Sequence, residues 1–301
     1  LKIKRENRES EYLTADKEII LSAGAIGSPQ ILQLSGIGPK ELLSQKGIDV
    51  LADLPGVGEN LHDHLQVRSV YKVENTVTLN QRAKSIFGKA VMGLEYLLFK
   101  TGPLTMPPSQ LGAFAKSDPE QTTANIESHV QPLSLDKFGD PLHAFNAITP
   151  SVCNLRPSSR GSVQIKSNDP RDYPEIKLNY LSTSADEQVA VEGLRLTRKI
   201  MRAKSLEKFN PQEWKPGPDI QTEEQLLDSA RNLGTTIFHP VGTCKMGSDE
   251  YAVVNDRLQV RGVKRLRVID ASIMPRITSG NTNAPTVMIA EQGAGFILET
   301  I

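Results

Sequence analysis

The chain has 301 residues, and its 35 basic and 35 acidic side chains cancel to a net charge of zero. This balance excludes a polycation that binds nucleic acid, and 38% apolar residues with only two cysteines exclude a disordered chain and a disulfide framework. No apolar run approaches the ~18 residues that a membrane span needs. We expect about two domains and a cytoplasmic protein, with peripheral association with a membrane left open.

The opening segment alternates short strands and helices. Residues 18–22 form an apolar run with β-branched side chains, which predicts a buried strand. A helix is expected next, because Ser28 is a suitable N-cap, Pro29 a suitable first helical residue and Gly36 a stop signal. The same signals predict a second short helix at residues 39–46.

The middle of the chain differs, with long polar loops and many prolines between helical and strand-like runs. Apolar residues at helical spacing predict a helix from residue 83 to residue 100. Two capping boxes, Ser184 with Glu187 and Thr222 with Gln225, each predict the start of another helix. This change of pattern indicates a second domain.

The last sixty or so residues return to the opening pattern. Residues 266–269 predict a strand, and residues 285–298 predict a helix. A loop-rich domain placed between two α/β segments gives one discontinuous domain with an insertion. The predicted boundaries are residues 1–66 and 238–301 for the discontinuous domain, and residues 67–237 for the inserted one.

Two sets of short motifs carry little functional information. His62 and His64 form a His-x-His pair, but no cysteine or third histidine lies at ligand spacing, so we expect a polar loop and no metal. Residues 36–38 and 56–58 each match half of a dinucleotide fingerprint, and turn formation explains both.

His239 is a stronger candidate because of its surroundings. Pro240 stiffens the backbone after the imidazole, and Gly242 lets the chain pass close to a neighbouring group. Residues 270–286 then carry a strand end, a polar loop and a helix start, and ligands of α/β sheets bind at such carboxyl ends. Asn283 lies at or beside the helix N-cap, where free amides would stabilise negative charge on a bound ring.

These segments resemble the glucose-methanol-choline (GMC) oxidoreductases, a family of flavin-dependent alcohol oxidases and dehydrogenases. Residues 24–38 match one family signature, residues 239–246 the segment of the catalytic histidine, and residues 266–291 the closing flavin-contact segment. Residues 279–286 are similar to the choline dehydrogenase-like branch. The resemblance covers the C-terminal portion of the family. It implies an α/β and α+β fold, in which part of a discontinuous Rossmann-like FAD-binding domain receives an inserted substrate-binding domain of antiparallel sheet plus helices.

The resemblance also assigns roles to residues. His239 would accept the alcohol proton while the carbinol hydride passes to flavin N5, and Asn283 would orient the alcohol oxygen by donating a hydrogen bond. The residues expected along FAD are Asp270 and Ala271 at its phosphate and ribityl portion, Asn283, Ala284, Pro285 and Thr286 near its isoalloxazine ring, and Ala23 and Gly24 on its adenosine side.

One departure from the family concerns the cofactor. The Gly-x-Gly-x-x-Gly unit that cradles the FAD pyrophosphate in the family is missing, and the chain opens without an initiator Met. We therefore expect a fragment of a longer enzyme that binds FAD poorly on its own. Function then refers to the parent enzyme.

The implied reaction is oxidation of a small alcohol to an aldehyde or ketone, with oxygen or a quinone as electron acceptor. Choline is one candidate only, because a quaternary ammonium needs an aromatic cage and aromatic residues make up 5% of the chain. Trp214 and Cys244 are expected to be packing residues. Two alternatives stay open: a cyanohydrin lyase on the same scaffold, with FAD oxidised throughout, and a truncated chain with no activity of its own.

Overall fold

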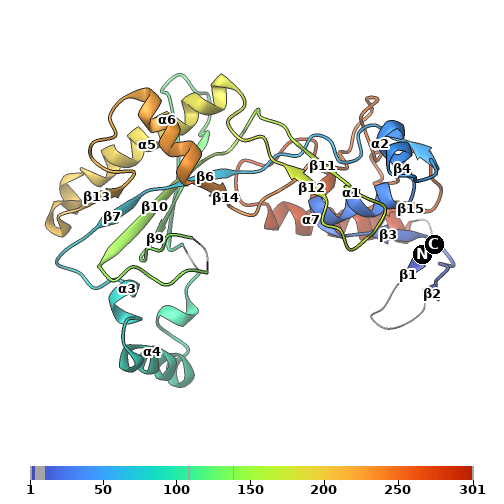
Figure 1. The fold of residues 1–301 in the computed structure, drawn as a ribbon. Helices are drawn as coiled ribbons and strands as arrows, with labels where there is room; N and C mark the ends of the chain where they lie inside the picture. The colour runs from blue at the N-terminus through green and yellow to red at the C-terminus, as the bar shows by residue number, and fades with distance from the viewer. Residues whose placement is uncertain (1, 4–10, 108, 138, 300–301) are drawn as a thin grey trace. The chain divides into compact units, whose positions relative to one another are not determined.

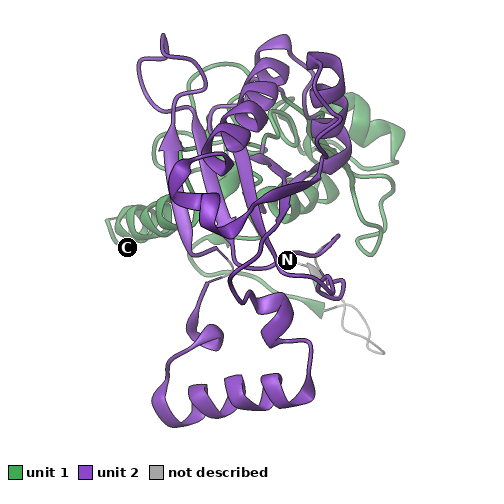
Figure 2. Ribbon diagram, turned by 90° about the vertical axis from the view of Figure 1, so that its left-hand side faces the viewer, with its two compact units in different colours: residues 1–62, 160–179, 239–301 green, residues 63–159, 180–238 purple. Residues whose placement is uncertain are grey.

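The computed structural model describes residues 2–3, 11–107, 109–137 and 139–299. The chain forms two compact units, coloured separately in Figure 2. Unit 1 comprises residues 1–62, 160–179 and 239–301, and unit 2 comprises residues 63–159 and 180–238.

Segment 160–179 departs from the boundaries drawn from sequence, because it packs within unit 1. Gln33 fixes it there: its Nε2 donates to Val163 O at 3.0 Å, and Ile165 N donates to its Oε1 at 2.9 Å. Gln33 is fully buried, so these bonds satisfy an amide that water does not reach. The sequence alone could not reveal them, since the partners lie about 130 residues apart.

Unit 1 is built from short strands and three α-helices (Figure 1). Its elements are β1 (Lys2–Ile3), β2 (Glu11–Tyr12), β3 (Ile19–Leu21), α1 (Gly24–Leu34), β4 (Ile37–Gly38), α2 (Lys40–Gln45), β5 (Ala52–Asp53), β11 (Ser162–Gln164), β12 (Glu175–Lys177), β15 (Leu266–Val268), the 3₁₀ turn η3 (Ala271–Ile273) and α7 (Asn283–Leu298). β3 and β15 pair in parallel, with Leu21 opposite Val268. Their carboxyl ends therefore meet at one edge, as the α/β interpretation expects.

Helix α1 begins a turn earlier than the sequence indicated, at Gly24 and not at Pro29. Pro29 lies inside the helix and has no N–H to donate to the carbonyl four residues earlier, Ala25 O. Thr243 supplies the missing donor, because Thr243 Oγ1 donates to Ala25 O at 2.6 Å. A hydroxyl from the segment that follows His239 thus replaces the hydrogen bond that Pro29 cannot make within α1.

Unit 2 is a seven-stranded antiparallel sheet with helices on one side (Figures 1 and 2). Its elements are β6 (Leu65–Arg68), β7 (Val70–Lys72), α3 (Leu79–Arg82), α4 (Ile86–Phe99), η1 (Pro103–Thr105), β8 (Leu111–Ala115), β9 (Ile126–Gln131), β10 (Ala147–Asn154), α5 (Ser184–Met201), η2 (Lys204–Phe209), β13 (Gln212–Lys215), α6 (Glu223–Leu233) and β14 (Gly234–Thr236). The main strand order is β13-β7-β10-β6-β14, and β9 joins β10 to β8. Apolar side chains of α5 and α6 pack with Val67, Ile126 and Val152 of the sheet.

The helix starts of unit 2 test the capping predictions. Thr222 and Gln225 form the predicted capping box, which is confirmed at the start of α6. α5 begins one residue earlier than expected, because Thr183 accepts the cap hydrogen bond from Asp186 N. The two observed helix starts lie within one residue of the predicted ones, as expected when a local side-chain hydrogen bond decides the boundary.

The helix predicted at residues 83–100 is shorter, and α4 begins at Ile86 with Ser85 as its N-cap. Met92 is the buried residue of α4, while large apolar side chains of this helix, including Phe87, Leu97 and Phe99, are exposed. α4 stands away from the sheet of unit 2 in both Figure 1 and Figure 2. No helix in the described part of the chain has the length and hydropathy to cross a membrane.

Candidate active site

The carboxyl ends of β3 and β15 bring two predicted cofactor residues into contact. Asp270, after β15, accepts hydrogen bonds from Gly24 N at 3.0 Å and from Ser28 Oγ at 2.6 Å on one carboxylate oxygen. Its other oxygen accepts from Ser272 N at 2.8 Å. Ala23 joins the group, since its N–H donates to Ser28 Oγ at 3.1 Å. Three donors therefore hold this carboxylate at the edge where α/β folds bind ligands.

The segment that carries His239 runs along this edge. Cys244 N donates to Ser272 O at 2.9 Å and Met246 N donates to Ile273 O at 2.7 Å, so the segment is tied to the turn that follows Asp270. Gly242 has a φ of +97°, and a Cβ there would lie 2.5 Å from Asn60 O and 2.7 Å from His62 Cε1. The glycine is needed for both its backbone conformation and its close approach.

His239 is 9% exposed, and its Nε2 lies 3.4 Å from Asn281 Nδ2. Sequence reasoning selected Asn283, and the structure places Asn281 beside His239. Asn281 precedes Asn283 by two positions, in the segment that leads into α7. Asn283 is exposed and is the first residue of α7.

Helix α7 begins at Asn283, two residues before the expected Pro285, and Thr282 is its N-cap without a side-chain cap bond. The predicted flavin-contact residues Asn283, Ala284, Pro285 and Thr286 therefore form its first turn. Of these residues only Asn283 and Ala284 have backbone amides without an intrahelical acceptor, because Pro285 has no N–H and Thr286 N donates to Thr282 O at 3.1 Å. These two amides carry the positive end of the helix dipole. In the loop before α7, Thr278 Oγ1 is buried without a hydrogen-bond partner among the described residues.

The two histidines of the His-x-His pair are structural. His62 Nδ1 lies 2.6 Å from Asn60 O, and its Nε2 accepts from Ile277 N at 2.9 Å, which fixes the neutral tautomer with the proton on Nδ1. His64 Nε2 lies 3.1 Å from Leu155 O in unit 2. Neither ring can ligate a metal through these bonded nitrogens, and the described residues hold no cluster of three or more metal-ligating side chains.

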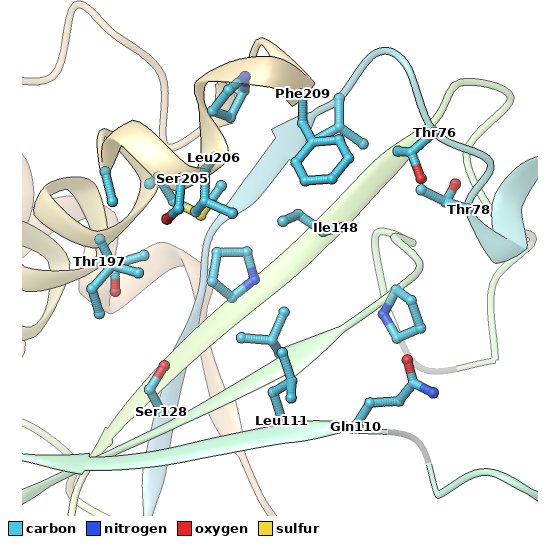
Figure 3. Close-up of a pocket in the computed structure, with 18 of the residues that line it drawn as sticks. Thr76, Thr78, Gln110, Leu111, Ser128, Ile148, Thr197, Ser205, Leu206 and Phe209 are labelled. Atoms are coloured by element: carbon cyan, nitrogen blue, oxygen red, sulfur yellow. The ribbon is translucent and has the colours of Figure 1, made fainter.

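Unit 2 contains an apolar cavity of about 630 Å³ between the sheet and the end of α5 (Figure 3). Ile148, Leu206, Phe209 and Leu111 surround it, and none of its lining residues is charged. The cavity therefore offers apolar contact and a few hydroxyl or amide groups. It contains no side chain able to accept a proton from an alcohol at neutral pH.

Trp214 packs in an aromatic cluster of unit 2. Its ring lies 5.1 Å from that of Phe145 and 4.6 Å from that of His143, both edge-on. The Nζ atoms of Lys72 and Lys215 lie 5.9 Å and 4.8 Å from the Trp214 ring centre. The chain's own cations thus occupy the ring, which agrees with a packing role and not with a cage for a bound cation.

Both cysteines are buried. Burial raises the pKa of the Cys153 thiol to about 12, and burial raises the pKa of the Cys244 thiol still further. Both thiols are protonated at neutral pH and are poor nucleophiles. Cys244 belongs to the apolar core of unit 1, as expected of a packing residue.

Sequence comparison places this geometry in a family. Residues 1–66 match the N-terminal profile of the GMC oxidoreductases and residues 157–290 match the C-terminal one. The chain belongs to the GMC oxidoreductase family. The family resemblance and the α/β architecture expected from sequence are thereby confirmed.

Among similar proteins is the oxygen-dependent choline dehydrogenase of Pseudomonas fluorescens (strain SBW25), 45% identical over 94% of this chain and 50% of that protein. A variant of Aspergillus oryzae RIB40 formate oxidase studied for FAD modification matches with a TM-score of 0.89 and 25% identity, over 96% of this chain and 55% of that one. Pyridoxine 4-oxidase from Mesorbium loti matches with a TM-score of 0.81 and 29% identity, over 96% and 52%. The chain spans about half the length of the curated relatives it matches.

Proposed function

We propose that this chain supplies the catalytic residues for FAD-dependent oxidation of an alcohol to an aldehyde or ketone. The observation that carries the proposal is the placement of His239. It is held beside Asn281 and tied to the carboxyl edge of the parallel strands in a chain of the GMC family.

In the proposed reaction, His239 Nε2 accepts the hydroxyl proton of the alcohol. Asn281 and Asn283 are the neutral donors of the same loop and helix start, and one of them steadies the alcohol oxygen without competing for its proton. FAD, when bound, supplies at N5 the acceptor for the hydride that leaves the carbinol carbon. Pro240 and Gly242 hold the imidazole by fixing the backbone that follows it.

The residues present fit the cofactor. The amides of Asn283 and Ala284 and the positive end of α7 would stabilise negative charge on the isoalloxazine ring, and Thr278 Oγ1 offers a buried hydroxyl with an open hydrogen-bonding position. Asp270 and Ala271 would lie along the phosphate and ribityl portion, with Ala23 and Gly24 toward the adenosine. We assign flavin binding to unit 1 and substrate recognition to unit 2.

The substrate is proposed to be a small alcohol, with choline as one candidate because curated relatives carry the name oxygen-dependent choline dehydrogenase. Oxygen or a quinone would take the electrons. The lyase alternative gains no support from the relatives described above, since each is a dehydrogenase or an oxidase by name.

An anaerobic absorbance experiment tests the proposal. The full-length parent enzyme loaded with FAD is mixed with a panel of primary alcohols that includes choline, and the oxidised-flavin bands are followed. Bleaching by one or more alcohols is the expected result. Bands that persist with every alcohol, while dithionite still bleaches them, would contradict alcohol oxidation.

A further inference from the structure

A short segment of unit 1, residues 58–62, runs between two other segments of the same unit. On one side, Leu61 and Gly161 exchange backbone hydrogen bonds at 2.9 Å and 2.8 Å. On the other side, His62 and Val241 exchange backbone hydrogen bonds at 3.2 Å and 2.9 Å. Residues 58–62 are therefore held on both sides, and one side is the segment that carries the proposed proton acceptor.

The side chain of Asn60 extends this connection to a third segment. Its Nδ2 donates to Gly242 O at 3.2 Å and to Pro275 O at 3.4 Å, in the loop before α7. Its Oδ1 accepts from Arg160 Nε at 2.9 Å, which fixes the orientation of the amide. An amide suits this position, because one side chain donates to two carbonyls and accepts from a guanidinium. The φ of Asn60 is +62°, in a left-handed region that asparagine adopts more readily than most residues.

His62 makes a second side-chain connection to the same loop. Its Nε2 accepts from Ile277 N at 2.9 Å, and its Nδ1 lies 2.6 Å from Asn60 O. The ring is 2% exposed, so water does not replace these hydrogen bonds when they are lost. Asn60 and His62 together thus connect the segment of residues 239–246 to the loop that leads into α7.

The two connected segments carry the groups on which the proposed reaction depends. The first carries His239, and the second leads through Asn281 to the first turn of α7, which we assign to the isoalloxazine ring. The proton and the hydride leave the same alcohol molecule, so the groups that accept them must be correctly spaced. A displacement of about 1 Å between reacting groups can cost about 10²-fold in rate.

We infer that Asn60 and His62 are positioning residues that set the spacing between His239 and the first turn of α7. This inference rests on the proposed function, which it deepens by naming the residues that place the proton acceptor. Both nitrogens of His62 are engaged with backbone groups, so this ring acts through the loop before α7 and not on the alcohol.

Four variants of the full-length parent enzyme test the inference. Asn60→Gly removes the amide, and glycine tolerates the left-handed backbone without added strain. Asn75→Gly is the matched control, because Asn75 has a φ of +53°, lies exposed in unit 2 and donates to Lys208 O at 2.9 Å. His62→Leu removes the acceptor for Ile277 N, whereas His62→Gln supplies an oxygen acceptor in its place.

The first measurement is the anaerobic rate at which an alcohol reduces the flavin, expressed per bound flavin. Asn60→Gly and His62→Leu should lower the limiting rate about 10- to 100-fold and change the half-saturating alcohol concentration less than about three-fold. His62→Gln should stay within about five-fold of the wild type, and Asn75→Gly should equal it. The pH midpoint of the rate should not move, because His239 remains the proton acceptor.

The outcomes that overturn the inference are equally specific. A wild-type limiting rate in Asn60→Gly and His62→Leu would show that the spacing does not depend on these side chains. A pH midpoint that shifts in His62→Gln would assign proton transfer to His62 itself. Lower FAD content or lower Tm with an unchanged rate per bound flavin would leave only a structural role.

Hydrogen exchange, followed by mass spectrometry without any alcohol present, gives a readout that is independent of turnover. Asn60→Gly should speed exchange about ten-fold in both connected segments, residues 239–246 and 275–283, because each loses a hydrogen bond. Asn75→Gly should change neither segment. Unchanged exchange in both segments of Asn60→Gly would also overturn the inference.

Failure of this inference is distinguishable from failure of the proposed function. If alcohols bleach the flavin of Asn60→Gly at the wild-type rate, the positioning role is wrong and alcohol oxidation stands. If no alcohol bleaches the flavin of the wild type while exchange rises in both segments of Asn60→Gly, Asn60 still positions the two segments and the proposed reaction is wrong.

Discussion

Replacing Thr243 by valine tests whether its hydroxyl replaces, at Ala25 O, the N–H that Pro29 lacks in α1. Thr243 is fully buried and donates to Ala25 O, the carbonyl that Pro29 cannot reach. Valine keeps the shape of threonine and removes the donor, so the carbonyl loses a bond in a buried place. Such a loss costs about 1–3 kcal/mol of the free energy of unfolding. For a domain of 150–250 residues, each kcal/mol corresponds to about 2–4 °C in Tm.

A double-mutant cycle with Pro29→Ala isolates the cause. Alanine at position 29 restores an N–H that can bond to Ala25 O, so Thr243→Val should cost about 1 kcal/mol less in that background. Unfolding in urea, followed by circular dichroism on the four proteins, measures the difference. Thr243→Ser keeps the hydroxyl and should lose only the contribution of one methyl group, about 0.8 kcal/mol. An identical cost of Thr243→Val in both backgrounds would refute the reasoning.

Two further predictions concern stability. Gly242→Ala should destabilise the protein by about 1–3 kcal/mol more than Gly262→Ala, because both have positive φ but only at Gly242 would the new Cβ overlap Asn60 and His62; equal thermal shifts would contradict this. Burial favours protonation of Asp186, but hydrogen bonds from Ser159 and Ser158 outweigh it and lower its pKa below 3.8. The wild type should therefore have a higher free energy of unfolding than Asp186→Asn above pH 3.8, and this difference should shrink as the pH falls through the lowered pKa. Urea unfolding of both proteins at several pH values measures the difference. A difference that stays constant down to pH ~2 would be incompatible with this assignment.

Sequence reasoning predicted the elements whose signals are local. The strand around Ile20 was predicted because it is a short apolar run with β-branched residues, and the strand around Arg267 was predicted from residues 266–269 alone. The capping box at Thr222 was predicted because its reciprocal hydrogen bonds span three residues. These features need no information from distant parts of the chain.

The misplaced boundaries share a physical cause. At the start of α1, Ser28 donates to the distant Asp270, and the distant Thr243 donates to Ala25 O, the carbonyl that Pro29 cannot reach. A prediction from the local capping preferences of Ser28 and Pro29 therefore misplaced this start. Segment 160–179 was misassigned for the same reason, since Gln33 binds it from far away in sequence.

The candidate site was predicted in part. The motifs directed attention to His239, Gly24 and Asp270, and the structure joins the last two through a direct hydrogen bond. The family pattern points to Asn283, whereas the distance that places Asn281 beside His239 arises only from folding.

The most direct test of the account is the rate at which an alcohol reduces the flavin anaerobically in the full-length parent enzyme, compared between the wild type and His239→Ala. The account predicts a rate lowered about 10²- to 10⁴-fold with the FAD still bound, because the proton acceptor is lost. A rate equal to that of the wild type would contradict the role assigned to His239.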